Sequence, residues 1–222
     1  MIICSDTWKE QQPPAWVGIL AVSGAPNTDQ SPELRHASQQ LEEELRERFG
    51  SLDRPKLRAL PVFAAYDSFY RRFKKTYHVQ LQLESVVFKG KQIRYPSALV
   101  GAMFMAELKT GLLTAAHDLE AIKLPLTADI AQGAETYQRL DGSHQELKAG
   151  DLYIRDQNKI LSSVIYGPDQ ATQVTANTER AVYTTYGPPG ITREQVLEEL
   201  QILESYIHLF APHAHREQLI AI

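Results

Sequence analysis

The feature that most constrains the fold is a stretch of fourteen residues, Ser97 to Thr110, that is apolar on nearly every side of a helix. Gly111 follows it and supplies a residue that ends helices. A helix that is hydrophobic all round cannot lie at a surface, because part of its apolar side would then face water. We therefore expect other elements to cover this helix on all sides, in a layered fold.

The residues before this helix carry both strand and helix signals. Trp16 to Gly24 is an apolar run that ends in glycine, as is typical of a buried strand. Ser31 and Pro32 predict the start of a helix that Gly50 ends. Leu57 to Phe63 is predicted to be a second strand, which would complete a strand-helix-strand opening.

Two segments just before the buried helix are short or ambiguous, and the chain changes character after that helix. Asp67 is predicted to cap a short helix, and His78 to Lys91 fits a strand and a helix face equally well. Short strands and turns are expected from about Leu112 to Tyr186, and Thr192 with Gln195 forms a capping box that opens a last helix. We predict an α+β fold, with a β-rich second half and a closing C-terminal helix.

Composition excludes several classes of protein. The 222 residues, 43% of them apolar, suit one domain over residues 1–222. A net charge of -4 argues against a nucleic-acid coat protein, although it allows a local basic face. The single cysteine, Cys4, excludes an internal disulfide and a cysteine-based zinc site, so a cytoplasmic location is expected. No apolar run is long enough for a membrane span, and the polar opening does not suit a signal peptide.

The sequence contains no signature of a bound cofactor. The phosphate-binding patterns GxxxxGK[ST] and GxGxxG are absent, and so is the nucleophile pattern GxSxG. His208, His213 and His215 offer nitrogen ligands, but no carboxylate stands at ligand spacing. We favour a surface or tail position for these histidines and expect neither a metal nor a cofactor.

A few polar residues in the second half are candidates for a site. His117 and Asp118 suit either an ordinary loop or the lining of a polar pocket. Hydroxyl residues also interrupt two predicted strands, where they either face solvent or line one pocket: Ser162, Ser163, Thr184 and Thr185.

A basic segment is the one region that suits a phosphate backbone. It contains one acidic residue, Glu84, and aromatic residues lie between its cations. The seven cations are Arg71, Arg72, Lys74, Lys75, Lys89, Lys91 and Arg94. The alternative is a solvated basic face without a partner.

Sequence segments in the second half of the chain are similar to those of a known family. The segments LKAGDLYIRDQNKILSSVIYG and TANTERAVYTTY, after a Leu140-Asp141-Gly142 turn, resemble the B3/B4 module of the phenylalanyl-tRNA synthetase β chain, which binds tRNA and edits it. The buried helix that ends at Gly111 and the residues up to Asp118 match the same module. The resemblance covers roughly residues 70–189.

The resemblance implies a layered α+β fold with a pocket between the β-rich half and the buried helix. In the synthetase that pocket hydrolyses tyrosine wrongly attached to the phenylalanine tRNA. This chain lacks an aminoacylation core, so the resemblance implies a freestanding hydrolase of mischarged tRNA that meets the aminoacylated acceptor end. In that hydrolysis His117 would act as the base, and five hydroxyl residues would orient a water: Thr114, Ser162, Ser163, Thr184 and Thr185. The alternative is a non-catalytic module that binds RNA or an amino acid.

The polar positions of the family are not kept. Ala115 stands where the family has a histidine, and Thr184 stands where it has an acidic residue. Gly101 and Phe104 replace an aspartate and an asparagine on the helix. These differences favour either another aminoacyl group or no chemistry, and they leave the amino acid, the oligomeric state and the role of residues 1–65 open.

Overall fold

The computed structural model describes residues 1–12, 14–29 and 31–222. Its strands are β1 (Ile2–Cys4), β2 (Trp16–Ser23), β3 (Leu113–Asp118), β4 (Leu126–Ile130), β5 (Thr136–Gln138), β6 (His144–Glu146), β7 (Leu152–Arg155), β8 (Ile160–Ser163), β9 (Gly167–Pro168), β10 (Arg180–Gly187) and β11 (His215–Ala221). Its helices are α1 (Asp6–Lys9), α2 (Pro32–Phe49), α3 (Arg54–Arg58), α4 (Pro61–Arg71), α5 (His78–Lys89), α6 (Ala98–Thr110) and α7 (Arg193–Phe210), with a short 3₁₀ turn at Leu119–Ala121.

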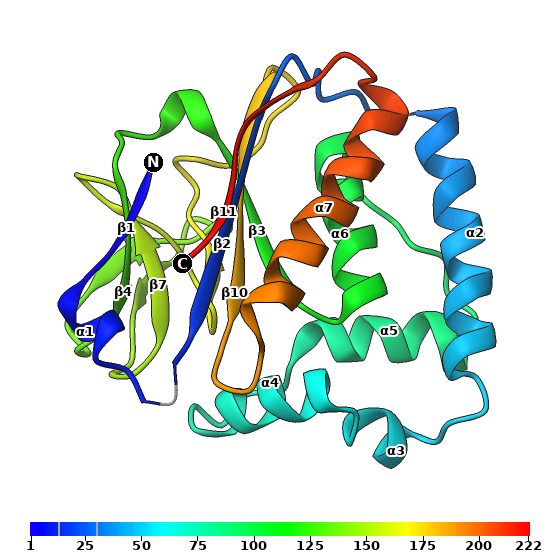
Figure 1. Ribbon diagram of the computed structural model, residues 1–222, viewed down its shortest axis with the longest axis horizontal. Coiled ribbons are helices and arrows are strands. Elements are labelled where there is room, and N and C mark those ends of the chain that lie inside the picture. Colours follow the sequence, from blue (N-terminus) through cyan, green and yellow to red (C-terminus); the bar gives the residue numbers. More distant parts are fainter. Residues whose placement is uncertain (13, 30) are drawn as a thin grey trace.

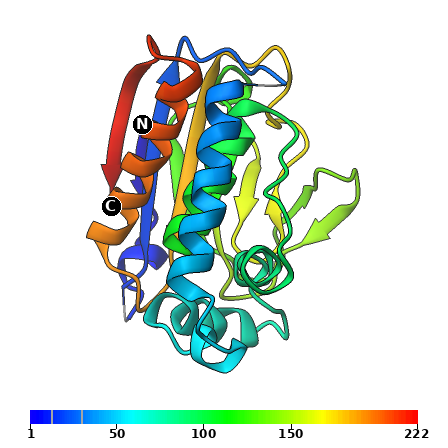
Figure 2. The same ribbon diagram turned by 90° about the vertical axis from the view of Figure 1, so that its right-hand side faces the viewer.

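The elements form layers, as the apolar helix requires. A central antiparallel sheet has the order β11-β2-β10-β3, and a second sheet has the order β1-β4-β7-β8-β9. One face of the central sheet meets the second sheet, and α6 and α7 cover the other face, with α2 outside them (Figure 1). Helices α3, α4 and α5 lie across the lower end of these layers (Figures 1 and 2). The α+β fold class predicted from the sequence is confirmed.

Strand β2 is the middle of the molecule, and a glycine in it sets how closely the helices approach. Its six interior residues are buried because the strand has a neighbour on each edge and a layer on each face. A Cβ added at Gly18 would lie 2.4 Å from Val196 Cγ1 and 2.7 Å from Leu200 Cδ1, both on α7. Only glycine therefore lets α7 pack at its observed distance from the sheet.

Several predicted boundaries are confirmed by their capping contacts. The Ser31 hydroxyl accepts from the Leu34 amide at the start of α2. Thr192 and Gln195 form both bonds of the capping box on α7. The Asp141-Gly142 turn joins β5 to β6, and Gly142 has a φ of +80°, a conformation that glycine adopts without strain.

The predicted strand Leu57 to Phe63 is wrong. Its first two residues end α3, its last three begin α4, and Ala59 and Leu60 join the two helices. A proline stands in the first turn of each helix, where its missing N–H costs nothing. Asp67 does not cap a helix either. It lies inside α4 as a buried carboxylate that accepts from Arg58 and Arg71.

Two further segments correct the reading from the sequence. The ambiguous His78 to Lys91 stretch is helical, as α5, with Gly90 in the left-handed conformation that ends it. The chain does not close on the C-terminal helix, because residues 215–221 return as β11 and pair with β2. His215 is exposed at the start of that strand.

Tyrosines join α4 and α5 to the lower end of the central sheet. The Tyr66 hydroxyl donates to the Tyr186 carbonyl and accepts from the Leu113 amide. Its ring stacks on Tyr77 at 4.2 Å between centroids, and the Tyr77 hydroxyl donates to the Gly111 carbonyl. These buried bonds fix α5 at the base of α6.

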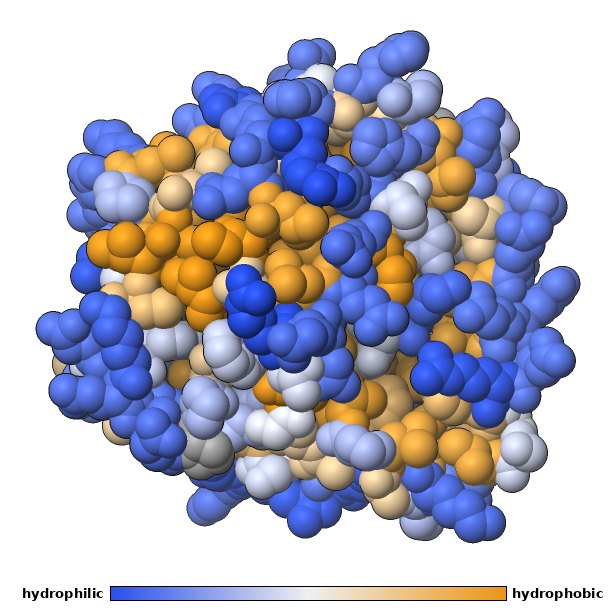
Figure 3. All heavy atoms as spheres, viewed as in Figure 1, coloured by the Kyte–Doolittle hydropathy of each residue, from blue (hydrophilic) through white to orange (hydrophobic). Residues whose placement is uncertain are grey.

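The outer surface differs between the two sides of the molecule. At the edge strand β1, Ile3 is 55% exposed, and Figure 3 shows apolar side chains gathered on this side, while hydrophilic side chains dominate over the helices. Among the described residues, no helix combines the length and the apolar character needed to cross a membrane.

Candidate functional site

The predicted hydroxyl residues are divided between the two faces of the central sheet and the second sheet, and they do not line one pocket. Neighbouring residues of a strand point to opposite faces, so Thr184 and Thr185 are on different sides of β10. Thr185 faces the helices, where its hydroxyl lies 2.7 Å from that of Thr114. Thr184 shares the other face with Tyr186, whose hydroxyl lies 2.7 Å from that of Ser162 in the second sheet.

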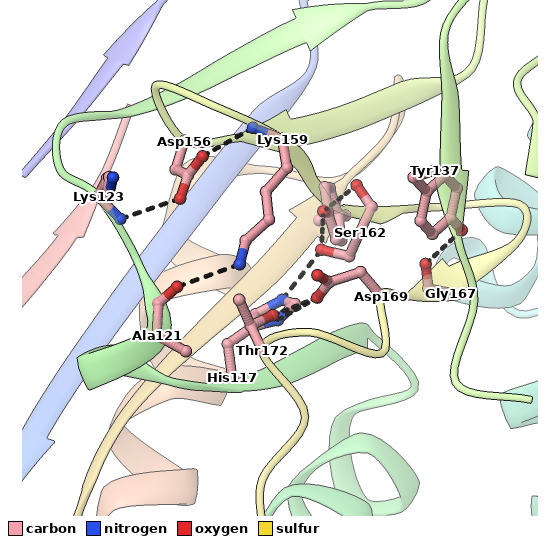
Figure 4. A network of polar contacts seen from close by, with 11 residues as sticks. His117, Ala121, Lys123, Tyr137, Asp156, Lys159, Ser162, Gly167, Asp169 and Thr172 are labelled. Carbon is pink, nitrogen blue, oxygen red and sulfur yellow. Dashed lines mark hydrogen bonds and ion pairs between the residues drawn. The ribbon is translucent and has the colours of Figure 1, made fainter. Parts of the chain in front are cut away.

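A chain of polar contacts joins the two sheets around His117 (Figure 4). Its Nε2 lies 3.1 Å from the Ser162 hydroxyl, and its Nδ1 lies 2.8 Å from the Thr172 hydroxyl. Thr172 in turn donates to Asp169, and the Asp169 carboxylate is 3.8 Å from Nδ1. One histidine on β3 thereby contacts β8 and the loop after β9.

The bond network assigns the protons of this chain. Because Thr172 donates to Asp169, the Thr172 oxygen accepts from Nδ1–H of His117. Nε2 is then the acceptor, and it takes the Ser162 hydroxyl proton. Burial, helped by Lys159, lowers the pKa of His117 to about 3, so the ring is neutral at physiological pH. A hydroxyl held against a neutral imidazole resembles the nucleophile–base pairs of hydrolases. While the ring stays buried, however, a pKa of about 3 makes it a weak base, because an effective general base has a pKa near the working pH.

This inter-sheet network is closed to solvent. His117, Ser162 and Thr184 each have 0% exposed surface, so no water-sized space touches their side chains. The Thr184 Oγ1 has no hydrogen-bond partner within the described residues. The structure therefore shows no open pocket for an aminoacyl group at these residues. Such a group reaches them only if the sheets separate.

Two buried carboxyl groups occupy the helix side of the central sheet. Glu199 of α7 accepts from the Thr114 hydroxyl at 2.6 Å, and Glu107 of α6 accepts from the Thr114 amide at 2.8 Å. Burial raises the pKa of Glu199 to about 7, and burial raises the pKa of Glu107 well above its ordinary value. Each carboxyl also raises the pKa of its neighbour when it is charged. The pair is therefore protonated, wholly or in part, near neutral pH.

Ser163 belongs to a third environment. Its hydroxyl accepts from the Tyr166 amide at 3.0 Å, beside the buried Asp151. Burial raises the pKa of Asp151 to about 7, and its Oδ2 has no hydrogen-bond partner in the described part of the chain. Ser162 and Ser163 thus serve different surroundings although they are adjacent.

The seven predicted RNA-binding cations, here called the basic strip, lie at the two ends of α5. Arg71 forms an ion pair with Asp67. Within residues 1–12, 14–29 and 31–222 the other six form no ion pair with a carboxylate: Arg72, Lys74, Lys75, Lys89, Lys91 and Arg94. All six are exposed, so their charges are available to a partner.

Charge is separated along the chain around this strip. Residues 46–94 contain 12 Lys and Arg against 4 Asp and Glu, a net charge of +8. The remaining residues carry -12, which gives the total of -4. The modest net charge therefore conceals a strongly basic segment, which folds as the end of α2, α3, α4, α5 and the loop that follows.

Two grooves flank α5. The α4–α5 groove has a volume of about 990 Å³ and contains Arg71 and Arg72. The α5–α6 groove has a volume of about 900 Å³, lies between α5, the loop of residues 90–94 and α6, and contains Lys91 and Arg94. Both grooves are lined by members of the basic strip, and Leu81 lies between them.

Some residues of the site are missing from the sequence-based prediction. These are Glu107, Asp151, Asp169, Thr172, Tyr186 and Glu199. For Glu107 a signal exists, because a single acid inside an otherwise apolar helix must be buried. For Asp169 and Thr172 no local signal exists, since both lie in an irregular loop whose position depends on the second sheet.

The fold is an α+β module in which a central sheet lies between a second sheet and a layer of helices. The model of the B3/4 domain family matches residues 65–201, which is more than half of the chain. The chain belongs to the B3/4 domain family, and the resemblance noted in the sequence is confirmed.

A solved structure supports the same fold. It is an N-terminal fragment of the phenylalanyl-tRNA synthetase β-subunit from Pyrococcus horikoshii, with a TM-score of 0.50 and 12% identity. The alignment covers 98% of this chain and 54% of the fragment, so the chain spans about half the length of that fragment. Comparison with curated protein sequences gives no match.

Proposed function

We propose that this protein binds tRNA through the basic strip. The observation that carries the proposal is the set of six exposed cations without carboxylate partners at the two ends of α5. Cations that are paired with carboxylates would have to lose that partner before they could contact a phosphate. Among the described residues none of these six has a carboxylate to lose, and Arg72 and Lys75 lie over aromatic rings. Family membership supports an RNA of the translation apparatus as the partner. The cytoplasmic location expected from the lone cysteine agrees with such a partner.

The closed inter-sheet network favours binding without chemistry in the conformation observed. The candidate catalytic side chains His117 and Ser162 have no exposed surface, whereas the residues of the basic strip are exposed. An electrostatic surface steers a polyanion to the protein even when most of the molecule is acidic. The binding role therefore rests on groups that a ligand reaches directly.

Removing two charges of the strip should weaken tRNA binding. We expect Lys74→Gln with Lys89→Gln to lower the affinity for a tRNA transcript about tenfold at about 0.1 M salt, because two phosphate contacts are lost. The slope of log affinity against log salt should fall by about 2. Fluorescence anisotropy with labelled tRNA over a salt series measures both quantities.

The matched control removes two lysines from the opposite side of the molecule. Lys9 and Lys123 are exposed and lie beside the second sheet, so Lys9→Gln with Lys123→Gln changes the net charge equally. The control should bind like the parent protein. Equal losses in both variants would show that only net charge matters and would refute a specific strip.

A second candidate function is hydrolysis of aminoacyl-tRNA, and the Asp169-Thr172-His117-Ser162 chain favours it. If the two sheets separate, Nε2 of His117 is ready to accept a proton from a water, and the unpaired Thr184 hydroxyl can orient that water. An aminoacyl ester is already activated, so a positioned water and a base suffice.

A panel of mischarged tRNAs tests this second candidate. We expect the parent protein to release one or a few amino acids faster than buffer, and Ser162→Ala to change the rate because it removes a direct contact of His117. Binding of tRNA by the same samples serves as the control. Binding without accelerated release of any amino acid would eliminate the hydrolase and leave the binding role.

A further inference from the structure

The α5–α6 groove differs from its neighbour in charge and in lining. In the α4–α5 groove the acids Asp67 and Glu84 pair with arginines. Among the described residues that line the α5–α6 groove none is acidic, while Lys91 and Arg94 stand at its rim. The α5–α6 groove therefore suits an anionic ligand. In the α4–α5 groove, by contrast, ion pairs already involve several of the charged side chains.

The floor of the α5–α6 groove is apolar and carries an aromatic ring. Phe104 is half-buried in α6, and Leu108 lies one turn further along the same helix. Gln82 and Gln92 are exposed beside this floor and present amide donors and acceptors. The groove therefore combines a flat apolar surface, amide groups and two cations.

We propose that the α5–α6 groove holds an unpaired nucleotide, with its base against Phe104 and its phosphate on Lys91 and Arg94. A flat base stacks on an aromatic ring, and its edges bond to amides, which is how single-stranded RNA is recognised. A free amino acid fits poorly, because its ammonium group finds no carboxylate among the residues of this groove. The volume of about 900 Å³ is ample for one nucleotide.

An unpaired nucleotide has two sources, a free nucleotide or a single-stranded part of an RNA. The arrangement of charges favours the RNA, because Lys89 lies directly beside the groove and Lys74 and Lys75 lie at the other end of α5, where a longer phosphate chain would run. This inference rests on the proposed tRNA binding and adds the position at which a single strand leaves the duplex.

The experiment compares two RNAs that differ only in a single strand. One is a hairpin with a four-nucleotide 3′ overhang that carries 4-thiouridine, and the other is the same hairpin with a blunt end. Phe104→Leu keeps an apolar side chain but removes the ring, so we expect about tenfold weaker binding of the overhang RNA and unchanged binding of the blunt one. Phe88→Leu makes the same change on α5 outside the groove and should leave both affinities as they are.

Photocross-linking of the unaltered protein keeps the test independent of any effect of substitution on folding. The thiouridine should attach to peptides of α5, residues 90–94 or α6. Binding of the overhang RNA without cross-links there, with Phe104→Leu unchanged, would overturn the groove assignment while the basic strip stands. Absence of binding for both RNAs would overturn the strip as well. Displacement of the overhang by AMP at equal concentration would assign the groove to a free nucleotide instead of the RNA.

Discussion

At pH 8, Glu199→Gln is expected to raise the free energy of unfolding by about 3 kcal/mol. The carboxyl is fully buried between α6 and α7, and burial raises its pKa from 4.5 to about 7. In the unfolded chain it releases its proton above pH 4.5, so folding at pH 8 must either take the proton back or bury a charge. Glutamine never ionises, and its amide oxygen accepts from Thr114 while its nitrogen can donate to Thr110.

The pH dependence separates this cause from a simple packing effect. The stability of the parent protein should fall as pH rises from about 4.5 to about 7, and the variant should lack this part of the fall. The two proteins should be equally stable near pH 4, where the carboxyl is protonated in both folded and unfolded chains. Glu107 keeps some pH dependence in the variant, because burial raises its pKa as well.

Urea unfolding followed by circular dichroism at pH 4, 6 and 8 provides the measurement. Glu198→Gln is the matched control, since Glu198 is the adjacent residue on α7 and is exposed. It should change stability by no more than about 0.5 kcal/mol at any pH. Parallel pH profiles for the parent and Glu199→Gln would mean that the pKa of Glu199 is the same in the folded and unfolded chains, and would refute a pKa raised by burial.

Gly18→Ala is expected to destabilise the protein by about 3 kcal/mol. The new methyl group would meet Val196 and Leu200 at 2.4 Å and 2.7 Å, and both side chains are fully buried, so neither has free space to move into. Relief requires α7 to shift from the central sheet, which disturbs its packing against α6 and α2.

A double-mutant cycle identifies the contact. Val196→Ala alone leaves a cavity and should cost about 1–3 kcal/mol, but in the Gly18→Ala background it removes the clash. The double variant should therefore be more stable than the sum of the two single losses predicts. Strict additivity in thermal unfolding would show that the glycine does not set the distance between α7 and the sheet.

Local signals predicted the elements whose ends are fixed by their own side chains. Ser31 with Pro32 and Thr192 with Gln195 give the starts of α2 and α7, because caps act within one turn. The prediction of a strand over Leu57 to Phe63 was wrong because the period of this apolar run is ambiguous. Pro55 and Pro61 each suit the first turn of a helix, and they begin α3 and α4. Strand β11 could not be predicted, because its pairing with β2 joins segments almost 200 residues apart.

The site was less predictable than the fold. His117 was identified as a candidate, but its partners come from a loop and a second sheet whose positions the sequence does not reveal. Thr184 and Thr185 could have been separated from the sequence, since the period of a strand sends adjacent side chains to opposite faces. The basic segment was visible because charge is a property of composition and needs no tertiary structure to be counted.

The order of strands in the central sheet has a consequence for how this chain is made. Strand β2 leaves the ribosome before both strands that pair with it, because β10 and β11 are synthesised only after residue 179. Its apolar run must therefore remain without its neighbours while the intervening residues are made, and unpaired strands are prone to associate with other chains. The helices from α2 to α6 emerge in that interval, so they are the first native elements available to cover it.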